Sequence, residues 1–131
     1  MQELETDAGS ATPDEIKRAL SRGHTIDITT TGRRSGEPRR LEIWLLGIDG
    51  RSFITGTPGR RDWLANLQAD PNLTVHLKQQ VHADLPARAT VVTDPETRRW
   101  VLTHAAATWY RGQVDLDRLV AEAPMVELSF D

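Results

Sequence analysis

Residues 24–55, HTIDITTTGRRSGEPRRLEIWLLGIDGRSFIT, contain three strand patterns in succession. Apolar and polar residues alternate over 24–31, which is the period of a strand with one buried face. Residues 39–48 also form a strand pattern, but they carry apolar side chains on both faces. Residues 51–55 form a third, shorter strand pattern. Asp49-Gly50 is a pair typical of two-residue hairpin turns that need positive φ. This stretch therefore predicts strands joined by hairpins.

The rest of the chain adds helices and further strands. The predicted helices cover 13–22, 60–69, 94–112 and 114–122, and the further strands cover 73–78, 85–93 and 125–130. Thr12, Pro13 and Glu15 fit the start of the first helix as a capping box. Six strands with hairpin connections and interspersed helices favour an α+β barrel-like sheet over parallel βαβ units.

Length and composition fit a single soluble domain. A chain of 131 residues is long enough for one real core. The acidic, polar residues 1–12 are expected to form a flexible N-terminal tail before a domain spanning 13–131. No apolar run approaches the ~20 residues of a membrane helix. Since there is no cysteine, disulfides and thiolate chemistry are excluded, which fits a cytoplasmic protein.

Charge is distributed unevenly along the chain. The net charge is −3 overall, but residues 33–61 contain seven arginines and three acidic residues, which gives +4 for this segment alone. A nucleic-acid-binding domain usually spreads Lys and Arg over a whole face. The acidic remainder therefore argues against nucleic acid and for a small anionic partner.

The loop between the first two strand patterns is the strongest candidate for an anion site. Four of its residues are arginines within an eight-residue span: Arg33, Arg34, Arg39 and Arg40. Guanidinium groups are planar, always charged and well matched to phosphate and carboxylate. Gly32 and Gly36 are expected to take positive φ and to turn backbone N–H groups toward the ligand.

A second loop, Gly56-Thr57-Pro58-Gly59-Arg60-Arg61, has the same make-up and leads into a predicted helix. Helix N-termini also stabilise anions. Because both loops follow strands of one hairpin set, we expect them to converge on one polyanion. Neither loop matches a known phosphate-binding motif.

Residues for proton transfer are few. The four histidines, His24, His76, His82 and His104, lack a metal-ligand spacing, so we expect structural roles for them and no metal site. Glu42 is expected to pair with an arginine of the basic loop. Among the four tryptophans, Trp63 is the one expected to line a ligand site, since it follows the second basic loop directly. No catalytic residue can be named, which suits an enzyme whose cofactor carries the chemistry.

Two segments resemble a known family. Residues 29–39, TTTGRRSGEPR, resemble the opening motif of the deazaflavin-dependent nitroreductase family, the actinobacterial deazaflavin-dependent quinone reductases. Residues 63–75, WLANLQADPNLTV, are similar to the family's W-x-x-N-L-x-A-x-P-x-V segment, and the similarity extends over residues 24–93. The resemblance implies a six-stranded, mostly antiparallel split β-barrel with flanking helices. It also implies a reduced 8-hydroxy-5-deazaflavin cofactor, F420, whose tail carries a phosphodiester and several glutamates.

The resemblance also implies a set of site residues. By motif position, the phosphate and the start of the tail would be held by Arg34, Ser35, Gly36 and Arg39, with Pro38 beside them and Arg33 and Arg40 adding electrostatic attraction. The ring system would meet the backbone around Thr55, Gly56 and Thr57, with Trp44, Arg60, Arg61 and Trp63 close by. Trp109 and Tyr110 would lie on the substrate side. Hydride would pass from the cofactor to a quinone, a nitroaromatic, an activated alkene or an unsaturated lipid-like molecule.

Alternatives stay open at this point. A split-barrel oxidoreductase that binds FMN would also need a phosphate site, although a single short phosphate needs fewer arginines. A non-catalytic F420-binding carrier or sensor would need the same anion clamp without turnover. The expected partners are a small-molecule substrate and no nucleic acid, with peripheral association with a membrane left open. The sequence does not choose between a monomer and a homodimer.

Overall fold

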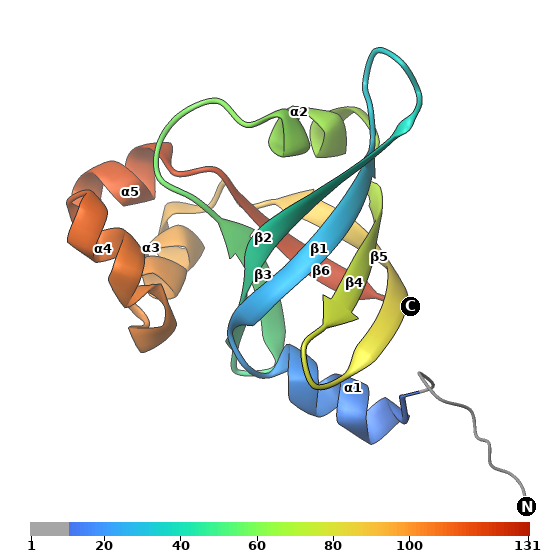
Figure 1. Ribbon diagram of the computed structural model, residues 1–131. Helices are drawn as coiled ribbons and strands as arrows, with labels where there is room; N and C mark the ends of the chain where they lie inside the picture. Colours follow the sequence, from blue (N-terminus) through green and yellow to red (C-terminus); the bar gives the residue numbers. More distant parts are fainter. Residues whose placement is uncertain (1–10) are drawn as a thin grey trace, which may run out of the picture.

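A closed barrel of six strands forms the centre of the computed structural model, which describes residues 11–131 (Figure 1). Its strands are β1 (His24–Thr31), β2 (Pro38–Ile48), β3 (Arg51–Thr55), β4 (Asn72–Lys78), β5 (His82–Val91) and β6 (Met125–Phe130). They follow the order β1-β2-β3-β6-β5-β4 around the barrel, and every neighbouring pair is antiparallel. The predicted α+β barrel is therefore confirmed, and Asp49 and Gly50 take the expected positive φ values of 50° and 78°.

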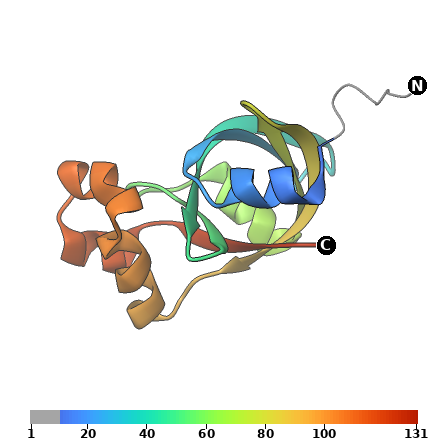
Figure 2. The same cartoon turned by 90° about the horizontal axis from the view of Figure 1, so that it is seen from below.

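Two short helices, α1 (Pro13–Leu20) and α2 (Asp62–Ala69), lie at opposite ends of the barrel (Figures 1 and 2). The predicted capping box of α1 is present, since Glu15 N donates to Thr12 Oγ1 at 3.1 Å and Thr12 N donates to Glu15 Oε1 at 2.8 Å. The remainder of the predicted tail, residues 1–10, lies outside the described residues. Gly47 of β2 lets the end of α1 approach, because a Cβ there would collide with backbone atoms of Leu20 and Ser21.

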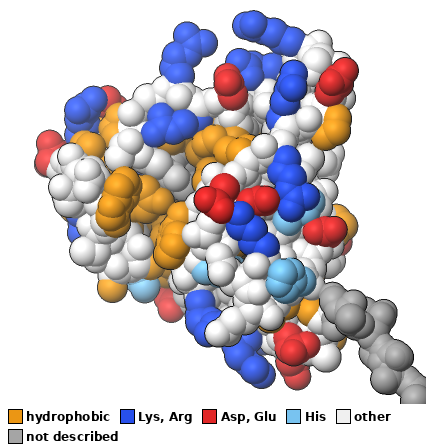
Figure 3. Space-filling model, in the orientation of Figure 1, with side chains coloured by type: hydrophobic (Ala, Val, Ile, Leu, Met, Phe, Trp, Pro, Cys, Tyr) orange, Lys and Arg blue, Asp and Glu red, His pale blue; other side chains and the backbone are white. Residues whose placement is uncertain are grey.

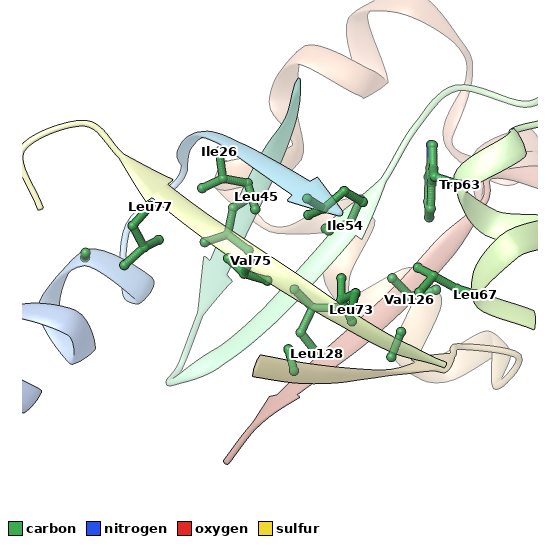
Figure 4. Close-up of a cluster of buried hydrophobic side chains, with 14 residues drawn as sticks. Ile26, Leu45, Ile54, Trp63, Leu67, Leu73, Val75, Leu77, Val126 and Leu128 are labelled. Atoms are coloured by element: carbon green, nitrogen blue, oxygen red, sulfur yellow. The ribbon is translucent and has the colours of Figure 1, made fainter. Parts of the chain in front are cut away.

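The interior of the barrel is the first of two apolar cores (Figure 4). Inward-facing aliphatic side chains of the strands fill it, among them Ile26, Leu45 and Ile54, which are fully buried. Trp63 and Leu67 of α2 cover this core from one end. Trp63 is therefore held in place by core packing.

A second core lies outside the barrel, between the sheet and a group of helices: α3 (Pro95–Thr103), α4 (Thr108–Gln113) and α5 (Leu116–Glu122). Leu46 and Ile48 of β2 and Phe53 of β3 belong to this core. The helices explain why residues 39–48 are apolar on both faces, because one face lines the barrel and the other contacts the helices. No helix within residues 11–131 is long and apolar enough to cross a bilayer.

The prediction of a single helix over 94–112 is wrong, because the helix is interrupted at His104. His104 is extended, with φ −66° and ψ 150°, and its Nδ1 accepts a hydrogen bond from Ala106 N at 3.1 Å. A short 3₁₀ helix, η1 (Ala105–Ala107), follows before α4 begins at Thr108. The Arg111 guanidinium donates to the carbonyls of Leu102 at 2.6 Å and His104 at 2.9 Å, which satisfies the end of α3.

The boundaries of two other elements also differ from the prediction. β5 begins at His82 rather than at residue 85, because residues 82–84 pair with His76–Lys78 in antiparallel register. His82 and Asp84 are exposed, whereas Ala83 packs against the barrel core. The helix predicted over 60–69 begins at Asp62, with Arg61 as its extended N-cap.

A buried arginine ties the helices together. Arg98 is only 8% exposed and donates to the carbonyls of Val120 at 2.6 Å, Val92 at 2.9 Å and Leu119 at 3.4 Å, and also to that of Ala123. Three of these carbonyls belong to the C-terminal end of α5, and Val92 follows β5. One side chain therefore caps α5 and fixes it to the barrel.

We expect Arg98→Met to lower the free energy of unfolding by about 3 kcal/mol, because buried carbonyls would lose charge-assisted hydrogen bonds. Urea denaturation of both proteins measures this change. The matched control is Arg99→Met, since Arg99 is half-exposed and its guanidinium pairs with the exposed Asp117 at 2.9 Å. That control is expected to cost less than ~1 kcal/mol. Equal effects of the two substitutions would contradict the capping role of Arg98.

Candidate functional site

A groove of about 540 Å³ lies between the tip of the β1–β2 hairpin and the start of α2. All four arginines of the hairpin loop line it, together with Ser35 and Trp63. Figure 3 shows Lys and Arg side chains gathered at this end of the molecule. We call this feature the arginine groove. It brings together most of the residues expected to hold the phosphate and the tail.

The hairpin loop is shaped by its own hydrogen bonds. Gly32 N donates to Glu37 O and Gly36 N donates to Gly32 O, both at 2.8 Å. Ser35 Oγ accepts from Glu37 N at 3.1 Å and from Arg39 Nη2 at 3.3 Å. Gly36 takes the predicted positive φ, at 74°.

Gly32 does not take the predicted positive φ. It is needed for a different reason, because a Cβ there would lie 2.7 Å from Ser35 Oγ. Glycine at this position therefore leaves room for the Ser35 hydroxyl and does not serve a left-handed backbone.

Asn66 of α2 anchors the loop, and this role was missed in the sequence analysis. Its Oδ1 accepts from Arg33 N at 3.1 Å and from Arg33 Nη1 at 2.9 Å, and its Nδ2 donates to Thr30 Oγ1 at 3.2 Å. Asp62 adds an ion pair with Arg33 at 3.2 Å. The signal in the sequence was a polar asparagine within the apolar WLANL segment. In the structure this asparagine is 4% exposed and joins α2, β1 and the loop.

The four arginines differ in how far the protein already occupies them. Arg33 is bound by Asn66 and Asp62, and Arg40 Nε donates to Asp27 at 3.0 Å. Arg34 makes no hydrogen bond or ion pair to any residue within 11–131, and Arg39 makes only one weak contact, with Ser35. Arg34 and Arg39 thus keep their donors available for a ligand.

A network of charges on the outer face of the barrel fixes Arg40. Hydrogen bonds from Lys78, at 2.6 Å, and from Arg40 hold the pKa of Asp27 below its usual value. Glu42 pairs with Lys78 in the same network, so the prediction that it pairs with an arginine of the loop is wrong. The strand register explains this pairing. β1 lies between β2 and β4, so Lys78 of β4 reaches across β1 to contact both Asp27 and Glu42.

The second basic loop lies at the same end of the barrel as α2 but does not line the arginine groove (Figure 1). Arg61 folds back on its own loop, where Nη2 donates to Thr57 O at 2.8 Å and to Thr57 Oγ1 at 3.2 Å. Thr55 is buried and donates to Pro124 O at 2.6 Å. The side chains of Arg61 and Thr55 therefore shape this segment. The two loops were expected to converge on one groove, but residues 56–61 do not line the arginine groove.

An apolar pocket of about 400 Å³ is lined by Trp44, Ala106, Trp109 and Tyr110, and we call it the aromatic pocket. The helix break at His104 places Ala106 and the start of α4 beside β2. Trp44 and Trp109 are 45% and 64% exposed, which is unusual for tryptophan. Trp44, which was expected near the cofactor ring, is thus grouped with Trp109 and Tyr110.

Tyr110 brings a hydroxyl group to the residues that line the aromatic pocket. It is 8% exposed and contacts Trp109 edge to face, with ring centroids 5.2 Å apart. Burial raises the pKa of its hydroxyl, so the group stays protonated at neutral pH. The hydroxyl has no hydrogen-bond partner within the described residues 11–131. It is therefore a donor without a protein acceptor beside an apolar cavity.

Comparisons with solved structures establish the fold. A conserved hypothetical protein, Rv2991 from Mycobacterium tuberculosis, superposes with a TM-score of 0.68 at 20% identity over 98% of this chain and 86% of that chain. An FAD-binding protein from Mesorhizobium loti gives 0.67 at 12% identity over 92% and 91% of the two chains. The F420-H2 dependent reductase FDR-A gives 0.57 at 21% identity over 80% of this chain and 93% of that chain.

The comparison with protein families goes further than the fold. Residues 4–121, which include the arginine loop, the WLANL segment and the helices of the aromatic pocket, match the family model described as F420H(2)-dependent quinone reductase. The chain therefore belongs to the F420H(2)-dependent quinone reductase family, a family of oxidoreductases.

Proposed function

We propose that this protein binds F420 with the phosphate and tail in the arginine groove and reduces a flat, quinone-like acceptor in the aromatic pocket. The observation that carries the proposal is the convergence of four loop arginines on one groove, two of them with donors to spare. Membership of the F420H(2)-dependent quinone reductase family supports the same cofactor.

The donor set suits the cofactor's tail. A phosphodiester followed by glutamates presents several negative charges in a row, and a groove with guanidinium groups along its length matches such a ligand. Arg34 and Arg39 are free to bind it, while Arg33 and Arg40 contribute charge from fixed positions. FMN, the alternative cofactor, carries one short phosphate and would leave much of this charge uncompensated.

The ring system would lie between the arginine groove and the aromatic pocket, along the segment 55–61. Bound F420 in its reduced form would supply the hydride, so the protein's part is to orient the two reactants and exclude water. The folded-back Arg61 keeps this segment in a defined shape, and Trp63 forms the adjoining wall of the groove.

The aromatic pocket suits a flat acceptor. Trp44 and Trp109 offer apolar faces, and Tyr110 offers one protonated hydroxyl that can donate to a carbonyl or nitro oxygen. Such a hydrogen bond favours hydride addition because negative charge develops on that oxygen. Quinones, nitroaromatics and activated alkenes all meet this description, and quinones best fit the family.

The first test is a titration with oxidised F420, followed by tryptophan fluorescence, with FMN as the parallel ligand. Arg34→Ala and Arg39→Ala should each weaken F420 binding by ~1–3 kcal/mol, since each removes charge-assisted hydrogen bonds. Rising salt should weaken binding to the unmodified protein because the ligand is an anion.

The matched control for these arginines is Arg88→Ala. Arg88 is an exposed arginine of β5 that does not line the groove, so its loss should leave F420 affinity unchanged. Unchanged affinity in the Arg34 and Arg39 variants would remove the arginine groove from the proposal. Tight binding of FMN alone would replace F420 with the flavin.

Asn66→Leu tests the anchoring of the loop. The substitution removes three hydrogen bonds, so amide exchange at residues 32–37 should accelerate and F420 binding should weaken, while stability falls by about 2 kcal/mol. Gln68→Leu, an exposed position on the same helix, is the control. Exchange rates equal to those of the unmodified protein would show that the loop holds its shape without Asn66.

Tyr110→Phe tests the acceptor side. The melting temperature should stay constant because the hydroxyl has no partner within residues 11–131, and F420 affinity should stay constant as well. In steady-state oxidation of reduced F420 by a naphthoquinone, kcat/KM should fall about five- to tenfold, the effect of one neutral hydrogen bond. No change in kcat/KM would exclude Tyr110 as the donor, and no turnover by the unmodified protein would favour a carrier or sensor.

A further inference from the structure

A second polar cleft of about 370 Å³ borders the aromatic pocket and has no part in the function described so far. It lies where the turn between α1 and β1 meets β2 and the turn between β4 and β5. Arg22, His24, Gln79 and Gln80 line it, and so does Trp44. Trp44 lines both this cleft and the aromatic pocket.

Gly23 leaves room for the edge of the Trp44 indole at the cleft. A Cβ at Gly23 would lie 3.2 Å from Trp44 Nε1 and 3.5 Å from Cζ2, so a larger residue would displace the indole slightly. Gly23 also lines the cleft, which puts the indole N–H at its border. This N–H has no hydrogen-bond partner within residues 11–131 and is available to a ligand.

The other polar groups of the cleft include Arg22, which only donates, and the amides of Gln79 and Gln80, which donate and accept. Arg22 is exposed, and within residues 11–131 its guanidinium makes only one long contact, of 3.4 Å, with Gln80 Oε1, so it keeps most of its donors. Among the described residues 11–131, no aspartate or glutamate lines the cleft. The nearby Asp27 is already paired with Lys78 and Arg40. A cationic group, an indole N–H and amide groups therefore face a space that carries no negative charge.

We propose that this cleft binds an anionic, carboxylate-type substituent of the acceptor whose flat ring lies in the aromatic pocket. This inference rests on the proposed function and narrows its substrate class to acceptors with an apolar ring and an acidic side chain. Arg22 would hold the carboxylate, and Trp44 would span the ring and the side chain. The apolar lining of the aromatic pocket and the polar lining of the cleft match the two parts of such a molecule.

The test compares two probes, 2-methyl-1,4-naphthoquinone and its derivative with a carboxyethyl group at carbon 3. Calorimetric titration into the protein without cofactor should give at least about tenfold tighter binding of the acidic probe, the worth of one charge-assisted hydrogen bond. Arg22→Gln should abolish this preference and leave the neutral probe unaffected. In turnover with reduced F420, the same variant should raise KM for the acidic probe only.

The control is Arg18→Gln, which makes the same charge change four residues earlier in α1 and lines neither cleft nor pocket. It should change neither probe's affinity, and melting curves should show both variants folded. Equal affinity of the unmodified protein for the two probes, or equal effects of the two substitutions, would overturn the assignment of the cleft. Selective binding of the acidic probe without turnover would support the cleft and overturn the reductase function instead.

Discussion

The wall formed by β2, β3 and β6 is the constraint on which the rest of this structure depends. Its inner face completes the barrel core, and its outer face is covered by the helices of the second core. Because both faces are apolar, neither core is complete without the other. The aromatic pocket exists only where this wall and the helices meet, with Trp44 from β2 on one side and Trp109 and Tyr110 from α4 on the other.

The barrel also determines how the arginine loop is presented. A hairpin loop that projects from a barrel has few neighbours, and four arginines there would repel one another and sample many shapes. Asn66 and Asp62 restrain the loop by binding Arg33, and both belong to α2, the helix that covers the end of the barrel. Because α2 holds Arg33, the loop is already ordered without a ligand, and binding loses less conformational entropy. Arg34 and Arg39 are left for recognition.

Local patterns in the sequence were sufficient to predict the strands and the first hairpins. Alternation identified β1 and β4, and Asp49-Gly50 identified the turn, because these features depend on neighbouring residues. The helix break at His104 was not predictable in this way. It depends on Arg111, which reaches back to the carbonyls that end α3, and this contact requires the tertiary structure. The predicted start of β5 was wrong for a related reason, since exposed polar residues at the start of a strand resemble those of a loop.

The site shows the same division between local and long-range information. The arginine loop was found because its composition departs from that of the chain, whereas Asn66 stands in an ordinary helix and acts on a segment more than thirty residues away. The prediction that Trp44 lies near the cofactor ring did not include its neighbours from η1 and α4, because the sequence pattern merged these two elements into one helix. Once that helix is broken, Trp44 borders both an apolar pocket and a cationic cleft. Under the proposed function, this position connects Trp44 with the choice of acceptor.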